Sequence, residues 1–213
     1  QNDPSNQRLQ LRKTPVQKRS FQTFNWILEA AAELFEKQGF EATTTNEIAE
    51  RAGVSVGSVY QHFPNKDTIL LQLMEQLSTE VVSALTGVVK RYQKLKAPPL
   101  EPMVREMLEV MLSFHLKSPV LHQECWSNTA YSEEIEAFKS EQRELLCQMV
   151  EAFLEFHPQV ELSNPRLSAW MLIHMVTSLV HEYVHQFSTL TDGAFFEELN
   201  RMILLYLQNP SAA

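Results

Sequence analysis

A tight turn between two short helices, within residues 39–66, constrains the fold more than any other part of the chain. Thr44 and Glu47 have the spacing of a capping box, in which the hydroxyl accepts a backbone N–H and the carboxylate accepts another in return. A helix is therefore predicted to begin near Thr45. Gly53 can adopt the left-handed conformation that ends such a helix, so the chain is expected to turn there.

The second short helix is predicted over residues 56–63, with Ser55 as its N-cap and Pro64 as its stop. Val59 and Phe63 are spaced i, i+4, so both are expected to face inward. Small and polar residues then cover the opposite face, which is what a helix needs if it is to enter a DNA major groove. The outward residues are Val56, Gly57, Tyr60 and Gln61.

Residues 52–66 read Ala-Gly-Val-Ser-Val-Gly-Ser-Val-Tyr-Gln-His-Phe-Pro-Asn-Lys and resemble the consensus of the TetR/AcrR-like (tetracycline-repressor) family of bacterial transcription regulators. The resemblance covers about residues 20–70 and is specific because it is a continuous run. It implies an all-α protein with a three-helix N-terminal DNA-binding domain and a larger C-terminal helical domain. The alternative for this segment is a helical hairpin without a role in DNA binding.

The resemblance also assigns DNA contacts. It implies that Thr44 and Tyr60 contact phosphates, and that His62 and Lys66 help to hold the DNA backbone. Position 56 often carries Lys or Arg in the family, so Val56 puts a polar base contact in doubt, although it could touch a thymine methyl. The residues expected at or near base edges are Ser55, Val56, Gly57, Ser58 and Gln61, and Asn46 belongs to the same predicted DNA-binding set.

Composition agrees with an all-α chain that has one small and one larger domain. The 213 residues include only five glycines and little β-branched alternation, and apolar residues recur at helical spacing. We expect a flexible basic arm over residues 1–19, the helix-turn-helix domain over 20–66, and a domain for effector binding and dimerisation over 67–213. Besides the two short helices, seven are predicted, at residues 16–38, 66–95, 102–117, from Pro119, 132–156, 165–187, and from Asp192 to before Pro210.

The distribution of charge along the chain agrees with a DNA-binding part followed by a second, acidic part. Residues 1–70 carry eight basic and eight acidic residues, so the net charge of −8 lies entirely in residues 71–213. This acidity would discourage the distal part from lying on DNA. Residues 8–19 hold five basic residues and no acidic one. This arm could neutralise phosphates or reach a minor groove, and the alternative is a solvated, disordered tail.

The two cysteines, Cys125 and Cys147, form no CxxC pair, and they favour a reducing, cytoplasmic setting. No signal peptide is visible at the start of the sequence. The longest apolar stretch, about residues 169–180, is too short and too polar to span a membrane.

One motif points to a different class of function. Residues 181–185 form a literal H-E-x-x-H, which on a helix places His181 and His185 on one face, ready for zinc, with Glu182 as a base. A zinc-dependent hydrolase is therefore the alternative function. No histidine follows His185 to supply a third ligand, although Glu197 or Glu198 could serve. We predict no catalytic residue, no metal site and no cofactor.

Methionine and aromatic residues in the distal part could supply the adaptable apolar walls of a ligand pocket. They recur at helical spacing, and His174 could act as a polar anchor among them. Ordinary core residues would show the same spacing, and this remains the alternative. The candidate effector-binding residues are Met107, Met111, Phe114, Trp126, Phe153, Trp170 and His174.

Together these patterns predict a ligand-responsive transcriptional regulator, most simply a repressor, that binds a palindromic operator as a homodimer. A small apolar or amphipathic effector would release it. The last two helices are expected to form the dimer, and no membrane is expected as a partner. The apolar residues that crowd the last helix too densely for one buried stripe are Phe195, Phe196, Leu199, Met202, Ile203 and Tyr206.

Overall fold

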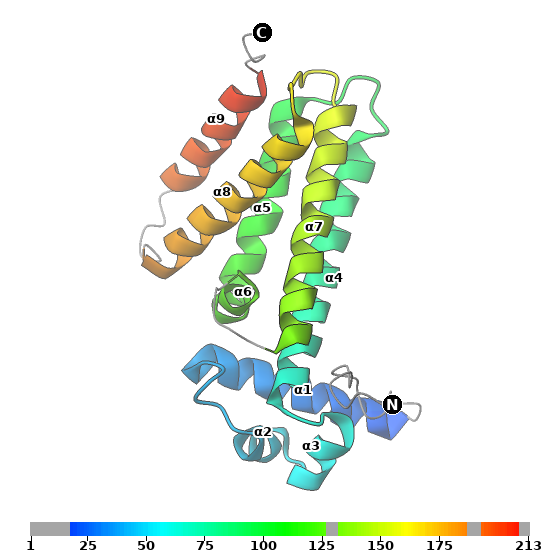
Figure 1. The fold of residues 1–213 in the computed structure, drawn as a ribbon, viewed down its shortest axis with the longest axis vertical. Helices are drawn as coiled ribbons and strands as arrows, with labels where there is room; N and C mark the ends of the chain where they lie inside the picture. Colours follow the sequence, from blue (N-terminus) through cyan, green and yellow to red (C-terminus); the bar gives the residue numbers. More distant parts are fainter. Residues whose placement is uncertain (1–17, 127–131, 187–192, 209–213) are drawn as a thin grey trace, which may run out of the picture. The chain divides into compact units, whose positions relative to one another are not determined.

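The computed structural model of the chain describes residues 18–126, 132–186 and 193–208, with side chains over 20–124, 132–184 and 193–208. All regular structure in these ranges is α-helix, and they contain no strand, which confirms the predicted all-α class. Figure 1 shows the helices in chain order. They are α1 (Lys18–Gln38), α2 (Thr45–Ala52), α3 (Val56–His62), α4 (Lys66–Tyr92), α5 (Leu100–Lys117), α6 (Pro119–Trp126), α7 (Glu133–Phe156), α8 (Pro165–Gln186) and α9 (Ala194–Gln208).

Helix ends differ from the prediction where proline chemistry intervenes. α4 ends at Tyr92 rather than near residue 95, and α5 begins at Leu100 rather than at residue 102. Pro99 precedes α5 in an extended conformation, with φ −74° and ψ 127°, and makes no side-chain cap, while the Leu100 N–H donates to Gln159 Oε1 at 3.2 Å. The predicted cap Asp192 lies outside the described residues, and α9 begins directly after Gly193, whose φ is 68°.

The chain divides into two compact units, one formed by residues 1–77 and 123–139 and the other by residues 78–122 and 140–213. The division falls inside α4, α6 and α7, so each of these helices contributes residues to both units. These two units are defined by how the residues pack. The boundary after residue 66, between a DNA-binding domain and an effector-binding domain, concerns function and stays a prediction.

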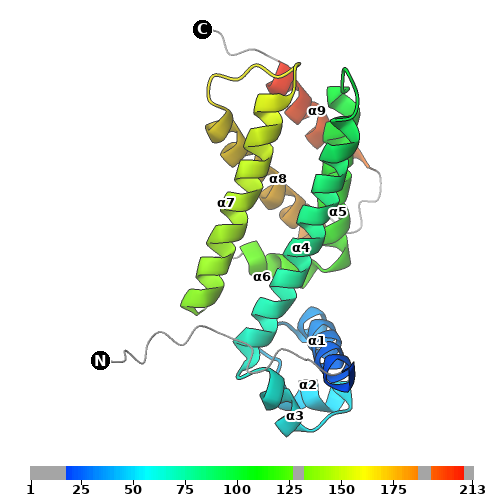
Figure 2. The same ribbon diagram turned by 90° about the vertical axis from the view of Figure 1, so that its right-hand side faces the viewer.

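The N-terminal unit is built around α1, which contacts both α2 and α3, while α2 also contacts α3 (Figure 2). Phe24 of α1 and Phe63, directly after α3, stack with their ring centroids 5.0 Å apart. Leu34 on the same helix is half-buried. The other buried apolar residues that join these helices are Ile27, Leu28, Ala31, Phe35, Ile48, Ala49 and Val59.

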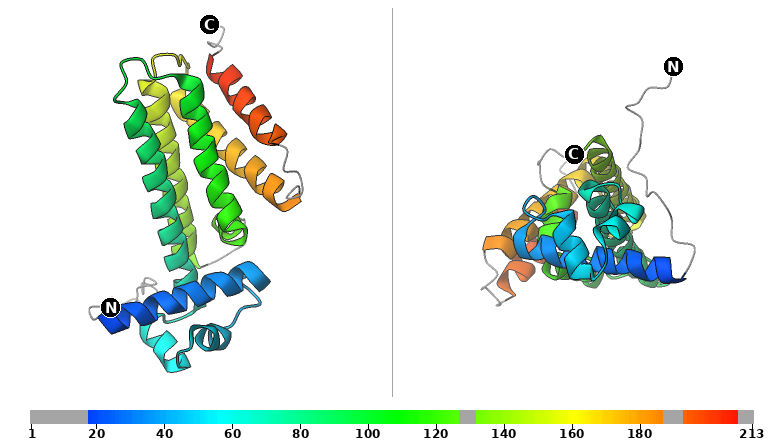
Figure 3. Two further views of the ribbon diagram at one scale, coloured as in Figure 1. Left: turned by 180° about the vertical axis from the view of Figure 1, so that it is seen from behind. Right: turned by 90° about the horizontal axis from the view of Figure 1, so that it is seen from below.

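The second unit is a layered helical bundle in which α5 contacts α8 and α9 (Figure 3). One continuous apolar core joins buried residues of the later part of α4 with those of α5, α7, α8 and α9. Burial of such a core provides the main driving force for folding of the unit. No helix in the described parts of the chain has the length and apolar character needed to cross a membrane.

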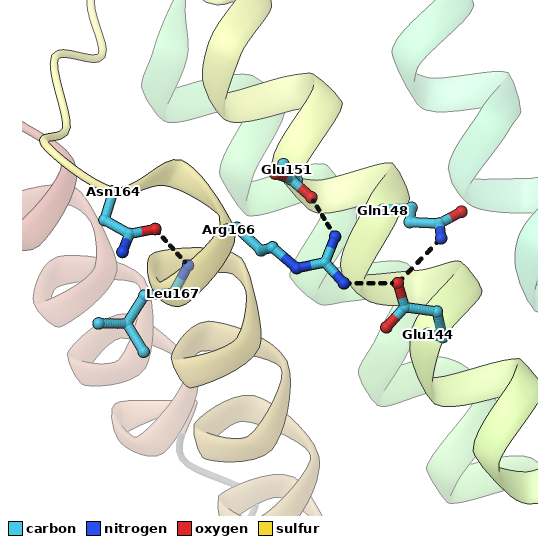
Figure 4. A network of polar contacts seen from close by, with 6 residues as sticks. All are labelled: Glu144, Gln148, Glu151, Asn164, Arg166 and Leu167. Atoms are coloured by element: carbon cyan, nitrogen blue, oxygen red, sulfur yellow. Dashed lines mark hydrogen bonds and ion pairs between the residues drawn. The ribbon is translucent and has the colours of Figure 1, made fainter.

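Polar contacts fix the corner between α7 and α8 (Figure 4). Asn164 caps α8, since its Oδ1 accepts the Leu167 N–H at 3.0 Å. Arg166 then reaches back to α7, where its guanidinium lies 2.9 Å from Glu144 Oε1 and 3.5 Å from Glu151 Oε2. The Arg166 side chain is 65% exposed, so these ion pairs orient the corner more than they stabilise it.

Candidate nucleic-acid interface and internal cavity

The turn between α2 and α3 is fixed at both of its ends by the residues that the sequence indicated. The Thr44 hydroxyl accepts the Glu47 N–H at 3.2 Å, and Glu47 Oε2 accepts the Thr44 N–H at 2.8 Å, so the predicted capping box is present. Gly53 ends α2 with φ 67°, and the Val54 N–H donates to the Ala49 carbonyl at 3.0 Å. This is a Schellman arrangement, which favours glycine because of its positive φ.

The start of α3 is also capped by a side chain. Ser55 Oγ accepts the Ser58 N–H at 3.1 Å and so caps the helix, as predicted. Val59 and Phe63 are fully buried, which leaves the opposite face of α3 toward solvent. Of the predicted DNA-binding residues, Val56 and Ser58 are half-buried. The exposed ones are Thr44, Asn46, Ser55, Gly57, Tyr60 and Gln61.

Lys66 has internal partners that the sequence did not indicate. Its Nζ donates to the Phe40 carbonyl at 2.6 Å and to the Glu41 carbonyl at 3.2 Å, and it lies 4.2 Å from the centre of the Phe40 ring. The ammonium therefore ties the start of α4 to the loop after α1. The ammonium has three N–H donors, so one N–H remains for another acceptor.

His62 is 6% exposed, and its ring meets Phe24 edge-on with the centroids 5.9 Å apart. Its ring belongs to the packing between α1 and α3, because position 62 faces back toward α1 when Val59 and Phe63 face inward. This burial gives no support to the predicted contact of His62 with the DNA backbone.

A cavity of about 90 Å³ lies inside the second unit, among α4, α5, α7, α8 and α9. Three of the predicted effector-binding residues, Met107, Met111 and Phe153, line it. Every other residue around it is also apolar. These are Leu85, Val104, Leu108, Val150, Leu154, Leu172, Ile173, Val176, Ile203 and Leu207.

The remaining effector-binding predictions do not fall on this cavity. Phe114 is half-buried and does not line it. Trp170 is 52% exposed on α8, and its ring centroid lies 4.3 Å from that of His174, whose Nδ1 is 2.8 Å from the Trp170 carbonyl oxygen. Both side chains lie away from the buried stripe of α8, so the cavity gives their predicted role no support. The side chain of Trp126 lies outside the described residues.

Apolar residues also lie exposed on α8 and α9, two helices that contact each other. Tyr206 of α9 is hydrogen-bonded to Ser168 of α8, with the two hydroxyl oxygens 2.6 Å apart, so the start of α8 lies beside the end of α9. The exposed apolar residues of these two segments, which we call the α8–α9 patch, are Leu167, Trp170, Met171, Met202, Leu205 and Tyr206. Met202 and Tyr206 belong to the predicted set of residues that crowd α9 too densely for one buried stripe.

Sequence reasoning missed a pair of buried histidines. His115 of α5 and His122 of α6 stack with their ring centroids 4.1 Å apart and their planes inclined by 21°. Burial lowers the pKa of both, and it brings that of His122 to about 3. The signal that could have found them is a histidine four residues after Met111, on the apolar stripe of α5.

The H-E-x-x-H segment is described only in part. His181 is half-buried and Glu182 is exposed on α8, while the side chain of His185 lies outside the described residues. Within the described side chains, no group of three histidine, cysteine or acidic residues is placed to hold a metal ion.

A capped helix-turn-helix followed by an all-helical unit defines a helix-turn-helix regulator. Residues 27–73 match the family described as bacterial regulatory proteins, tetR family. Residues 99–207 match the tetracyclin repressor-like C-terminal domain. The chain therefore belongs to the tetR family of bacterial regulatory proteins, and the resemblance read from residues 52–66 is confirmed.

Curated relatives support the same class. The uncharacterized HTH-type transcriptional regulator YvkB of Bacillus subtilis is 44% identical over 59 residues, which is 28% of this chain and 31% of YvkB. The HTH-type transcriptional repressor KstR2 of Mycolicibacterium smegmatis is 33% identical over 88 residues, covering 41% of this chain and 40% of KstR2. The chain thus spans less than two thirds of the length of these relatives.

Solved structures share the fold over most of the chain. A tetR-family regulator from Mesorhizobium loti has a TM-score of 0.72 at 20% identity, covering 90% of this chain and 98% of that one. NalD, the secondary repressor of the MexAB-OprM multidrug efflux pump in Pseudomonas aeruginosa, has a TM-score of 0.65 at 20% identity, covering 88% and 98%.

Proposed function

We propose that this chain is a ligand-responsive transcriptional repressor that binds a palindromic operator as a homodimer. The observation that carries the proposal is the capped α2–α3 turn, which leaves the outer face of α3 exposed with Gly57, Tyr60 and Gln61 on it. A rigidly capped helix with small and polar outward residues suits insertion into a major groove. The protein would act in the cytoplasm, by binding and without a catalytic step.

Within this proposal the exposed residues divide into two roles. Thr44 and Tyr60 contact phosphates, which fix the register of the protein on DNA without reading its sequence. Ser55, Gln61 and the half-buried Ser58 lie at or near base edges, and Gln61 is the side chain best suited to pair with an adenine. Asn46 is a further DNA contact in this proposal. Val56 offers a methyl group to a thymine.

The remaining donor of Lys66 makes a further phosphate contact in this proposal, while its other donors hold the loop after α1. His62 is left out of the contact set because it is buried. The basic arm, residues 8–19, neutralises phosphates and makes the affinity depend on salt.

The dimer forms through the α8–α9 patch in this proposal. A group of exposed tryptophan, methionine, leucine and tyrosine side chains on two helices that contact each other is typical of a surface that is covered in the working assembly. A two-fold axis through the patch would present two copies of α3. These would reach half-sites about 34–36 Å apart, or a multiple of that distance.

The effector binds in the apolar cavity lined by Met107, Met111 and Phe153. Typical ligand pockets hold about 300–1,000 Å³, whereas this one is about 90 Å³. An effector must therefore push helices of the second unit apart, and methionine side chains can move to allow this. A ligand that favours the widened form shifts the population away from the form that fits the operator.

Selection on random duplexes tests the DNA half of the proposal. We expect palindromic sequences to be enriched, and light scattering to give a dimer in solution. Absence of any sequence preference, together with a monomer, would contradict the proposal. A small-molecule screen for release of the selected operator tests the effector half.

A further inference from the structure

A pair of buried histidines lies one helical turn beyond the apolar cavity. Met111 lines the cavity, and His115 follows it by four residues on α5, a rise of about 6 Å. The His122 ring of α6 stacks on that of His115 at 4.1 Å. The two residues are 2% and 5% exposed, so the protein almost completely encloses them.

The hydrogen-bonding state of His115 follows from its neighbour. Its Nδ1 lies 2.7 Å from the backbone oxygen of Met111, and this oxygen can only accept. Nδ1 therefore carries the proton, and Nε2 of the neutral ring presents a lone pair.

His122 is in a different state. Neither of its ring nitrogens has a hydrogen-bond partner among the described residues, although both are buried. Buried polar groups in folded proteins are nearly always satisfied, so an imidazole with two unmet nitrogens needs an explanation. One ring nitrogen can donate and the other can accept.

The surroundings decide which kind of group can satisfy this pair. Burial lowers the pKa of both imidazoles, and His181 on α8 lowers it further, as does His115 for His122. Both rings are therefore neutral at physiological pH. Two neutral rings supply no formal charge to offset that of an anionic or ammonium group. A neutral group that both donates and accepts can bond to Nε2 of His115 and to one ring nitrogen of His122.

We propose that His115 and His122 bind the hydroxyl head group of an amphipathic effector, whose apolar tail occupies the cavity beside Met111. The hydroxyl donates to Nε2 of His115 and accepts from the N–H of His122. This assignment rests on the proposed function, because it names the chemical class of the effector that the cavity takes.

The position of His122 gives the head group a route to the rest of the chain. α6 holds both His122, which belongs to the second unit, and Gln123, which belongs to the unit that contains α2 and α3. A ligand that moves His122 therefore moves a helix shared by both units. The apolar tail alone would contact no residue of α6 among those that line the cavity.

Two matched probes without DNA test this head-group preference. 1-Octanol and octyl methyl ether have similar apolar tails, but the ether cannot donate a hydrogen bond. We expect isothermal titration calorimetry to show that the alcohol binds about tenfold more tightly, the effect of one buried hydrogen bond. The imidazole ¹⁵N resonance of His115 Nε2 should move with the alcohol and stay in place with the ether, which has no hydrogen to donate.

A substitution series keeps the test independent of simple damage to the fold. His115→Leu should bring the alcohol-to-ether ratio of affinities to about one, because it removes the acceptor of the one hydrogen bond that only the alcohol can donate. His174→Leu, which changes a half-buried histidine outside the cavity on α8, should leave the ratio unchanged. If His115→Leu does not fold by circular dichroism, the resonance shifts of the unaltered protein decide.

Equal affinity for the two probes would overturn the inference, and so would resonances that move with octanoate or Zn²⁺ but not with 1-octanol. If neither probe binds, the head-group assignment also fails. Release of the operator by compounds in the small-molecule screen then tests separately whether the protein responds to any effector.

Discussion

The hydroxyl oxygens of Tyr60 and Thr45 lie 3.1 Å apart, which joins the exposed face of α3 to the first residue of α2. Tyr60 is 41% exposed, so its hydroxyl can contact a phosphate as well as Thr45. The bond fixes the direction of the ring before any DNA arrives. Such pre-organisation reduces the entropy lost on binding.

Tyr60→Phe and Gln61→Ala should therefore weaken DNA binding in different ways. Loss of the Tyr60 hydroxyl removes a phosphate contact, so affinity should fall by a similar factor for every operator sequence. Gln61→Ala should relax the preference at one base pair, with a loss of discrimination of about 1–3 kcal/mol. Binding measured across a library of single-base operator variants separates the two patterns. The reverse result would mean that a different face of α3 reads the bases.

The capping box makes the stability of the N-terminal unit depend on pH through Glu47. Hydrogen bonds from the side chain and backbone of Thr44 lower the pKa of Glu47 below its ordinary value near 4.5. A depressed pKa in the folded state stabilises the fold above the unfolded-state pKa, and this contribution is lost as the pH falls through the folded-state pKa. Glu47→Gln should therefore lower stability at neutral pH, and the difference should shrink in acid.

Chemical denaturation of both proteins between about pH 7 and pH 3 checks this dependence. Glu50→Gln is the matched control, because Glu50 is an exposed glutamate on the same helix. The difference in stability between Glu50→Gln and the unaltered protein should not shrink in acid in the same way. A Glu47→Gln difference that is constant over the whole range would show that the capping carboxylate contributes nothing through its charge.

A feature of this fold could be predicted from the sequence where residues close together along the chain cause it. The capping box of Thr44, the positive φ of Gly53 and the cap at Ser55 each arise within a few neighbouring residues, and all three were predicted correctly. Asn65 is a further local case, since its Oδ1 accepts the Thr68 N–H at 2.8 Å and caps α4.

The cavity was harder to predict because α8 carries apolar residues on all sides. Trp170 and Ile173 are both large and apolar, yet the first is 52% exposed and the second is 7% exposed. Only packing against α5 and α9 decides which side of α8 is buried. The bonds of Lys66 to the loop after α1 join residues of different elements, so no local pattern reveals them. The place of His115 on the apolar stripe of α5 could indicate its burial, but no local pattern reveals its stack on His122.

The α8–α9 patch should control assembly. Met202 and Leu205 are 46% and 50% exposed on α9, and a glutamate at both positions would place charge in the proposed interface. We expect the double variant Met202→Glu, Leu205→Glu to be monomeric by light scattering. Leu116→Glu on α5, where the leucine is 57% exposed, should remain a dimer. A dimer that survives the double substitution would place the interface elsewhere.

The H-E-x-x-H segment should not act as a catalytic zinc site. The purified protein is expected to hold no stoichiometric zinc by elemental analysis, and Glu182→Gln should leave operator binding unchanged because Glu182 is an exposed residue of α8. One zinc per chain, with a peptidase activity that a chelator abolishes, would instead favour the hydrolase.

Gly57 offers the sharpest separation of stability from DNA binding. A Cβ added at this position would meet the Ser55 Oγ at 3.7 Å, an ordinary van der Waals contact, and Gly57 lies in the first turn of α3 without a positive φ. Nothing inside the fold therefore requires glycine here. Alanine is a better helix former by up to about 1 kcal/mol, so Gly57→Ala should leave the free energy of unfolding unchanged or raise it.

The same substitution should weaken operator binding, because the missing Cβ lets the backbone of α3 approach the floor of the major groove. We expect at least about a tenfold loss, the equivalent of about 1.4 kcal/mol, at every operator sequence. Denaturant unfolding and fluorescence anisotropy with the selected operator measure the two effects on one sample. Ser83→Ala, an exposed change on α4, is the control that should alter neither. An unaltered operator affinity in a stable Gly57→Ala protein would mean that α3 does not lie close to DNA at this residue.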